Sequence, residues 1–172
     1  ISILDLTDKS ITPLAGSGAP GLVDARGDGA RFSDPWGVAV LPDGNILVAD
    51  AANNVIRKVT LEGDVTVFAG DGFPGMRDDP DKLRARFDFP RDVAVDAAGN
   101  VYVTDTNNHR IRRITSSGGV ETIAGDGTAG FADGPGEVAR FYGQEQLDIT
   151  ADGKTLYVSD GNGGDGASFH RI

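Results

Sequence analysis

Residues 99–115 read GNVYVTDTNNHRIRRIT, and residues 44–60 read GNILVADAANNVIRKVT, with the same kinds of residue in the same order. Each copy holds a short apolar stretch, an aspartate, a polar turn and a second apolar stretch. Alternation with a period of two predicts a β-strand, because successive side chains of a strand point to opposite faces. Each copy therefore predicts two strands joined by a tight turn.

The repeat continues outward from these copies at a fixed spacing. The recurring landmarks are the aspartates Asp50, Asp105 and Asp160 and the phenylalanines Phe32, Phe87 and Phe141. The aspartates lie 55 residues apart, and the phenylalanines 55 and then 54. Landmarks of different types do not keep phase by chance, so the chain is a repeat protein. We read the recurring phenylalanines as core between repeats and the aspartates as acceptors of N–H groups in the turn that follows them.

Each repeat predicts four short strands. In the first repeat the expected strands are 37–40, 45–49, 55–59 and 65–69, and in the second they are 92–96, 101–104, 110–115 and 120–124. Turn signals rich in glycine separate them, and no segment shows a helical period. Four antiparallel strands repeated radially are typical of a β-propeller, which makes the predicted fold all-β.

Both ends of the chain fall inside a repeat. Residues 1–16 match the two outer strands of a blade, with Ile3 in the place of Ile111, and residues 126–172 match a connector and two inner strands. Between them, residues 17–70 and 71–125 each predict a connector and a complete blade. The chain thus holds three blade equivalents.

Three blades do not close a ring of ordinary geometry, since propellers have about 4–8. We therefore expect half of a six-bladed ring. Either two copies share their half-blades, or further blades complete the ring. Self-association through the half-blades is accordingly one expected partnership.

Composition narrows the function classes. The 172 residues carry a formal net charge of −10, which argues against nucleic acid as a partner. The basic stretches 57–58 and 110–113 could still touch RNA, but solvated outer strands are the simpler interpretation. There is no cysteine, hence no thiolate ligand or nucleophile, and no apolar run as long as a membrane span.

Residues 99–115, 35–59 and the connector AGDGTAGFADGPGEVARF at 124–141 together resemble the NHL repeat. The resemblance covers almost the whole chain and implies a propeller. It implies no single function, because NHL-like proteins include interaction scaffolds, RNA-binding propellers, lyases and lactonase-like enzymes.

The resemblance also implies that residues just before each inner strand lie near the mouth of a central channel. They vary while the frame around them repeats, so we take them as candidate partner-binding residues. The candidates are Trp36, Arg91, Asp92, Gln144 and Glu145. Tryptophan and arginine are the residue types that anchor interfaces. The competing interpretation is that Trp36 packs between blades.

Other chemistry finds less support. His109 and His170 occupy one repeat position, where a role in a turn or in an inter-blade contact is the simpler interpretation, and a metal site needs three or four ligands. No cofactor is predicted apart from a calcium hypothesis for the 160–166 loop, through Asp160, Asn162 and Asp165. These residues miss the usual calcium-loop spacing by one position.

The function expected from the sequence is a non-catalytic interaction or structural module. It would bind a protein, a peptide or a glycan, or assemble with other copies. The alternative is part of a propeller lyase or lactonase-like hydrolase whose metal and catalytic groups lie mostly outside these residues.

Overall fold

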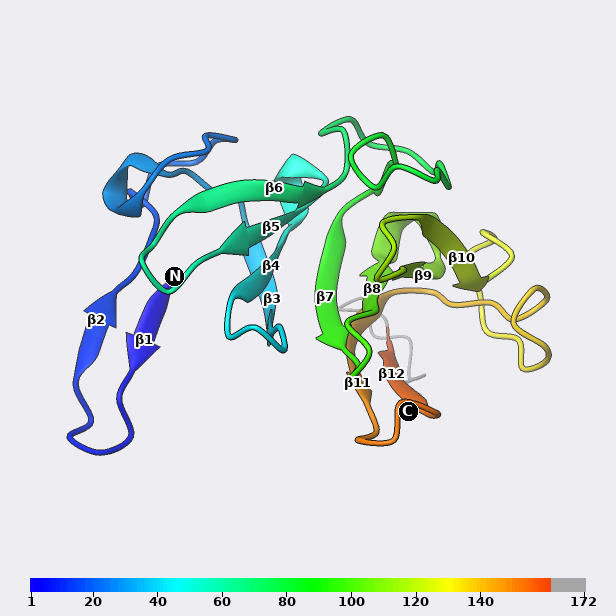
Figure 1. The fold of residues 1–172 in the computed structure, drawn as a ribbon. Helices are drawn as coiled ribbons and strands as arrows, with labels where there is room; N and C mark the ends of the chain where they lie inside the picture. Colours follow the sequence, from blue (N-terminus) through cyan, green and yellow to red (C-terminus); the bar gives the residue numbers. More distant parts are fainter. Residues whose placement is uncertain (162–172) are drawn as a thin grey trace.

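The computed structural model describes residues 1–161 as a row of antiparallel sheets (Figure 1). Two sheets are four-stranded blades with the strands in sequence order. The first contains β3 (Pro35–Val40), β4 (Ile46–Asp50), β5 (Val55–Val59) and β6 (Val65–Ala69). The second contains β7 (Pro90–Val95), β8 (Val101–Asp105), β9 (Arg110–Ile114) and β10 (Val120–Ala124). The predicted all-β fold with four-stranded blades is confirmed.

A two-stranded sheet lies on each side of the blades. β1 (Ser2–Leu4) pairs with β2 (Ile11–Pro13) at one end of the row, and β11 (Gln144–Ile149) pairs with β12 (Leu156–Asp160) beside the second blade. The inner strand β7 lies between the inner strands β3 and β11. The beginnings of these three strands form one edge of the row, which we call the mouth.

The strands form where β-branched residues follow one another and end at turns that need glycine. β8 is buried along its whole length, as expected for a strand covered on both faces. The turn after β3 is closed by the N–H of Gly44, which donates to the carbonyl of Leu41 at 2.9 Å. Gly44 has a φ of 84° and Gly99, in the same turn of the second blade, 79°, a region that side chains disfavour.

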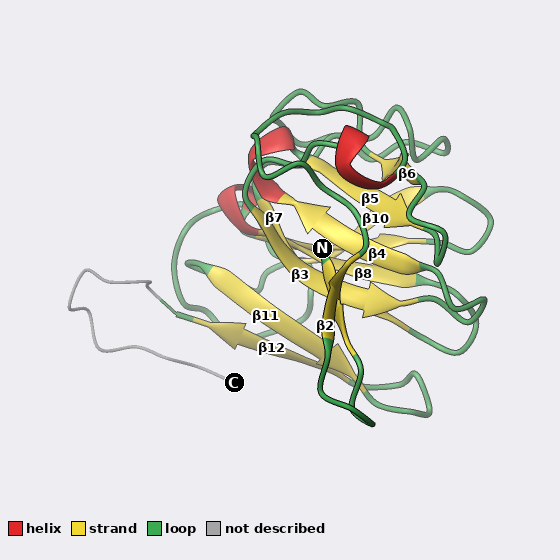
Figure 2. Cartoon of the chain, turned by 90° about the vertical axis from the view of Figure 1, so that its left-hand side faces the viewer, coloured by secondary structure: helices red, strands yellow, loops and turns green. Residues whose placement is uncertain are grey.

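Short helical turns connect β4 to β5 and β8 to β9. They are η2 (Ala51–Asn53) and η3 (Thr106–Asn108), and η1 (Gly27–Gly29) lies in the first connector. Figure 2 shows the helical turns in red towards the upper edge of the molecule. Asn54 and His109 end η2 and η3 in the left-handed conformation, with φ of 57° and 53°. The predicted turn role of His109 is therefore confirmed.

Hydrophobic core lies between successive sheets. The core between the two blades packs Phe87 against side chains such as Leu47 and Ile114. Phe32 lies in the core between β1–β2 and the first blade, and Leu147 lies in that between the second blade and β11–β12. Phe32 and Phe87 are thus core between repeats, as predicted. No helix among residues 1–161 is long and apolar enough to cross a membrane.

The register expected for the N-terminal strands is wrong by two residues. The N-terminal ammonium of Ile1 donates to the carbonyl of Ala15 at 2.7 Å, and the N–H of Ala15 donates back to Ile1 at 3.2 Å. In the blades, Ala69 pairs with Ile56 and Ala124 with Ile111. Ile1, not Ile3, therefore takes the position of Ile111, because the loop between β1 and β2 is one residue longer than the β5–β6 turn, whereas the expected register made it one residue shorter.

Candidate functional site

Three side chains from three successive inner strands form a row at the mouth. Trp36, Arg91 and Glu145 hold the same repeat position, since Arg91 follows Trp36 by 55 residues and Glu145 follows Arg91 by 54. The Arg91 guanidinium lies 5.0 Å from the Trp36 ring centroid and donates from Nη1 to Glu145 Oε1 at 3.3 Å. We call these three residues the mouth row.

The mouth row is partly open to solvent. The Trp36 residue is 49% exposed, and the side chains of Arg91 and Glu145 are 23% and 42% exposed. Phe89 also contacts Arg91, with its ring centroid 5.6 Å from the guanidinium. Trp36 thus contacts the next blade through Arg91 and still presents half of its surface.

Asp92 ties the inner strands together beneath the mouth row. Its Oδ2 accepts the N–H of Leu147 from β11 at 2.9 Å. On the other side, a Cβ built on Gly37 would lie 1.9 Å from Asp92 Oδ1, so only glycine leaves room for this carboxylate. Burial raises the pKa of Asp92, the N–H groups of Leu147 and Val93 lower it in part, and Asp148 raises it further. Asp92 therefore positions strands, and it is half-buried.

Gln144 points into the protein. It is fully buried, and its carbonyl accepts the Thr106 hydroxyl at 2.8 Å. Its side-chain amide has no hydrogen-bond partner within the described part of the chain. The same position in the two blades is occupied by Pro35 and Pro90, which carry no such polar group. Of the five mouth candidates, the structure therefore brings three into one open row, holds the half-buried Asp92 between the inner strands, and buries Gln144.

The recurring aspartates accept backbone N–H groups, as expected, but from the segment that precedes each inner strand. Asp50 accepts from Ser33 at 2.7 Å and Asp105 from Asp88 at 2.8 Å. Asp160 accepts from Tyr142 and Gly143, both at 3.0 Å. The expectation of backbone donors in the following turn was wrong for Asp50 and Asp105, because the strand end lies against the start of its neighbouring inner strand. Their following turns donate through side-chain amides instead, from Asn53 at 2.8 Å and Asn108 at 2.9 Å.

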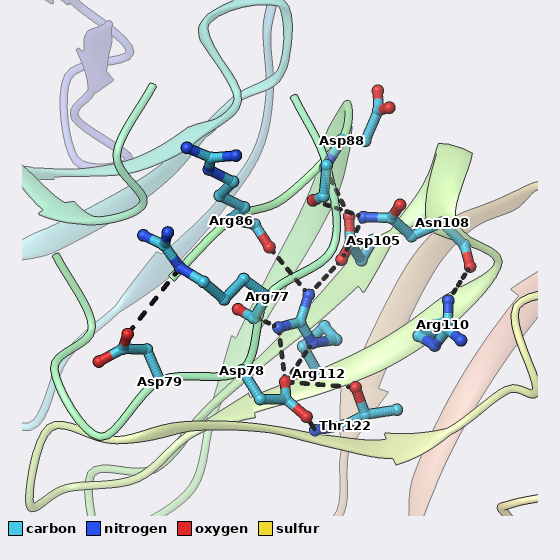
Figure 3. A network of polar contacts seen from close by, with 11 residues as sticks. Arg77, Asp78, Asp79, Arg86, Asp88, Asp105, Asn108, Arg110, Arg112 and Thr122 are labelled. Carbon is cyan, nitrogen blue, oxygen red and sulfur yellow. Dashed lines mark hydrogen bonds and ion pairs between the residues drawn. The ribbon is translucent and has the colours of Figure 1, made fainter. Parts of the chain in front are cut away.

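Sequence reasoning missed a pair of buried arginines. Arg112 donates to Asp105 at 2.5 Å and to Asp78 at 2.6 Å, and also to two backbone carbonyls (Figure 3). Arg57 makes the same contacts in the first blade, with Asp50 at 3.0 Å and Asp24 at 2.6 Å. We call each set of one arginine and two aspartates a buried clamp.

Arg57 and Arg112 have no exposed side-chain surface, so neither RNA contact nor a solvated strand face describes them. Burial raises the pKa of Asp105 to about 6, and the Arg112 charge offsets part of this rise. The signal that could have revealed the clamps was present. Arg57 and Arg112 recur in phase with Asp24 and Asp78, at 55 and 54 residues. Ser2 holds the arginine position in β1, opposite Pro13.

The described residues do not support the calcium and histidine metal sites considered from the sequence. Among residues 1–161, no group of three His, Asp or Glu side chains could hold a metal ion. Asp160 belongs to the backbone contacts described above, while Asn162, Asp165 and His170 lie outside the described residues. The ring Nδ1 of His109 is buried without a partner in the described chain.

Comparison with known proteins identifies the repeat. The NHL repeat model matches residues 32–58 and 87–114, which contain β4 with all but the last residue of β5, and the β8–β9 pair. A curated relative, Protein SUPPRESSOR OF QUENCHING 1, chloroplastic, from Arabidopsis thaliana, is 30% identical over 141 residues. The match covers 76% of this chain and 13% of that protein.

Solved structures with this architecture are larger. A protein of unknown function from Bacteroides thetaiotaomicron matches with a TM-score of 0.75 and 20% identity, over 91% of this chain and 38% of that one. An auxiliary nutrient binding protein from the same organism matches with a TM-score of 0.69 and 23% identity, over 92% of this chain and 40% of that one. These likenesses show the fold, and the chain spans less than half the length of either.

Proposed function

The chain belongs to the NHL repeat family of β-propellers, and from this premise we propose that it is a non-catalytic binding module whose partner contacts the mouth row. The partner is a protein, a peptide or a glycan. The observation that carries the proposal is the contact of Trp36, Arg91 and Glu145 across three successive inner strands.

The chemistry of the mouth row supports binding. A repeated position that needed one structural residue would keep it, as the buried clamps do. This position instead carries an aromatic, a cation and an anion that contact one another at the surface. Tryptophan and arginine supply large, rigid contact area and directed hydrogen bonds, which is why they dominate binding hot spots.

The carboxylates at the mouth support recognition more than proton transfer. Glu145 is paired with Arg91, and Asp92 is held by the N–H of Leu147. Both contacts fix the carboxylates in place. Fixed charges that hold a surface rigid reduce the entropy lost when a partner binds.

The test compares the full chain with the triple variant Trp36→Ala/Arg91→Ala/Glu145→Ala in a screen against immobilised peptides and glycans. Leu61→Ala is the matched control, because Leu61 is 60% exposed and lies in the β5–β6 turn, at the opposite end of the blade from the mouth. We expect every interaction of the wild type to weaken at least about tenfold in the triple variant, a change of about 1.4 kcal/mol. The control should bind like the wild type. An interaction that survives in the triple variant would place the site elsewhere.

A further inference from the structure

We propose that the mouth row binds a neutral glycan, with the apolar face of one sugar ring packed on the Trp36 indole. This inference rests on the proposed function and narrows it to one class of ligand. Three features carry it: the open indole, the internally balanced charges, and a polar hollow whose lining includes Asp92 and Gln146, the residues that follow Arg91 and Glu145 in the chain.

The indole is a flat apolar platform with one side supported. Arg91 stacks on the ring at 5.0 Å, and Trp36 keeps 49% of its surface exposed. The C–H groups on one face of a pyranose ring form a flat apolar patch of similar size. Packing that patch on an aromatic ring removes apolar surface from water while the hydroxyl groups at the ring edge stay free to hydrogen-bond.

The charges at the mouth row favour an uncharged ligand. Arg91 and Glu145 neutralise each other at 3.3 Å. An anionic ligand would approach a chain of net charge −10, and a cationic one would compete with Arg91 for Glu145.

The same pair leaves hydrogen-bonding capacity. Within residues 1–161, the one hydrogen bond between these two side chains uses Nη1 and Oε1, so Nη2 and Oε2 remain as a neighbouring donor and acceptor. A hydroxyl group both donates and accepts, so vicinal sugar hydroxyls fit such a pair.

A second group of polar side chains lies along β11 and β12, the sheet that carries Glu145. A hollow of about 380 Å3 beside β11 is lined by Asp92, Gln146, Leu147, Asp148, Tyr157 and Ser159. Tyr157 is 56% exposed and provides a second aromatic surface, among amide, hydroxyl and carboxylate groups. Like the mouth row, the hollow combines an aromatic ring with polar side chains. It therefore offers a place for a second sugar unit of the same glycan.

Trp36 makes the test direct, because it is the single tryptophan of the chain. The full chain is titrated with neutral hexasaccharides of glucose, mannose and xylose, with a galacturonic acid hexamer and a glucosamine hexamer as charged probes, and with a library of short peptides. We expect a saturable change of Trp36 emission with at least one neutral hexasaccharide. The galacturonic acid and glucosamine hexamers should bind at least about tenfold more weakly than that hexasaccharide.

Variants then separate the site from the ligand class. By calorimetry with the neutral probe, Trp36→Ala should weaken binding at least about tenfold, Trp36→Phe should retain part of it, and Leu61→Ala should leave it unchanged. Thermal melts check that each variant is folded. Emission changes caused by peptides or charged probes alone would overturn the glycan inference and leave the site in place. Neutral-glycan binding that persists in Trp36→Ala would overturn the site, and with it the proposed function. No emission change with any probe would overturn both.

Discussion

The buried clamps and the mouth row are built from the same kinds of residue and behave in opposite ways. Arg112, between Asp78 and Asp105, is fully buried and has a counterpart in Arg57, which is fully buried between Asp24 and Asp50. Arg91, between Trp36 and Glu145, is partly exposed and has no counterpart, because each blade places a different residue there. In a repeat protein, a residue that recurs at the same position in every repeat is one that the fold requires. A position that varies while the residues around it recur is free to serve a function.

Breaking a clamp should have the largest effect. Arg112→Met keeps the volume of the side chain but leaves Asp105 and Asp78 without their cation, so we expect the free energy of unfolding to fall by about 3–5 kcal/mol. Urea denaturation followed by circular dichroism measures the change. Arg57→Met should give a loss of similar size in the first blade. Losses below about 1 kcal/mol in both variants would contradict the role of the clamps.

The contact beneath the mouth row comes next. In Gly37→Ala the new methyl group would collide with Asp92, whose Cα lies 2.7 Å from the added Cβ position. We expect a loss of about 1–3 kcal/mol in unfolding free energy, because a packed strand must shift. The double variant Gly37→Ala/Asp92→Ala should recover only part of this loss, since the backbone contact remains. Full recovery would show that the carboxylate alone causes the clash.

Replacing Gln144 should stabilise the protein instead of destabilising it. Gln144→Met replaces an amide that has no partner among residues 1–161 by an apolar group of similar shape, at a position where Pro90 is tolerated. Removing a buried polar group that lacks a partner should raise the unfolding free energy by about 1–3 kcal/mol. A loss of stability, measured in the same urea titration, would mean that the amide has a partner other than the side chains and backbone of residues 1–161, such as an ordered water.

The mouth row should matter least to stability. Arg91→Ala removes a partly exposed ion pair, whose contribution is about 0–1 kcal/mol, together with its stacking on Trp36. We expect a change of no more than about 1 kcal/mol in the urea titration. A loss of unfolding free energy as large as that of Arg112→Met would show that the fold requires the mouth row, and would contradict the contrast with the clamps.

The sequence was sufficient to predict the features that depend on short-range patterns repeated along the chain. The turns at Gly44 and Gly99, the strand pairs around them and the core position of Phe87 all follow from short-range patterns in phase. It was not sufficient where burial depends on neighbours distant in the chain. Arg112 looks like a solvated strand residue until the connector carrying Asp78 covers it.

Two mouth candidates show the same limit. Asp92 and Gln144 were correctly placed at the beginnings of inner strands. Their burial depends on packing between blades, on Gly37 in one case and on the η3 turn in the other. The register of Ile1 was missed because the β1–β2 loop has one residue more than the β5–β6 turn. The recurring Ala-Gly pair at 15–16 follows β2, so it fixes the position of β2 and not the length of that loop.

Hydrogen exchange tests most directly the claim that binding belongs to the varied mouth. Exchange of the full chain is measured with and without the probe that changes Trp36 emission. Protection should appear in the segments that begin the inner strands, residues 33–38, 88–93 and 142–147. Protection confined to the turns at the opposite end of the blades, residues 41–45, 60–64 and 96–100, would contradict it.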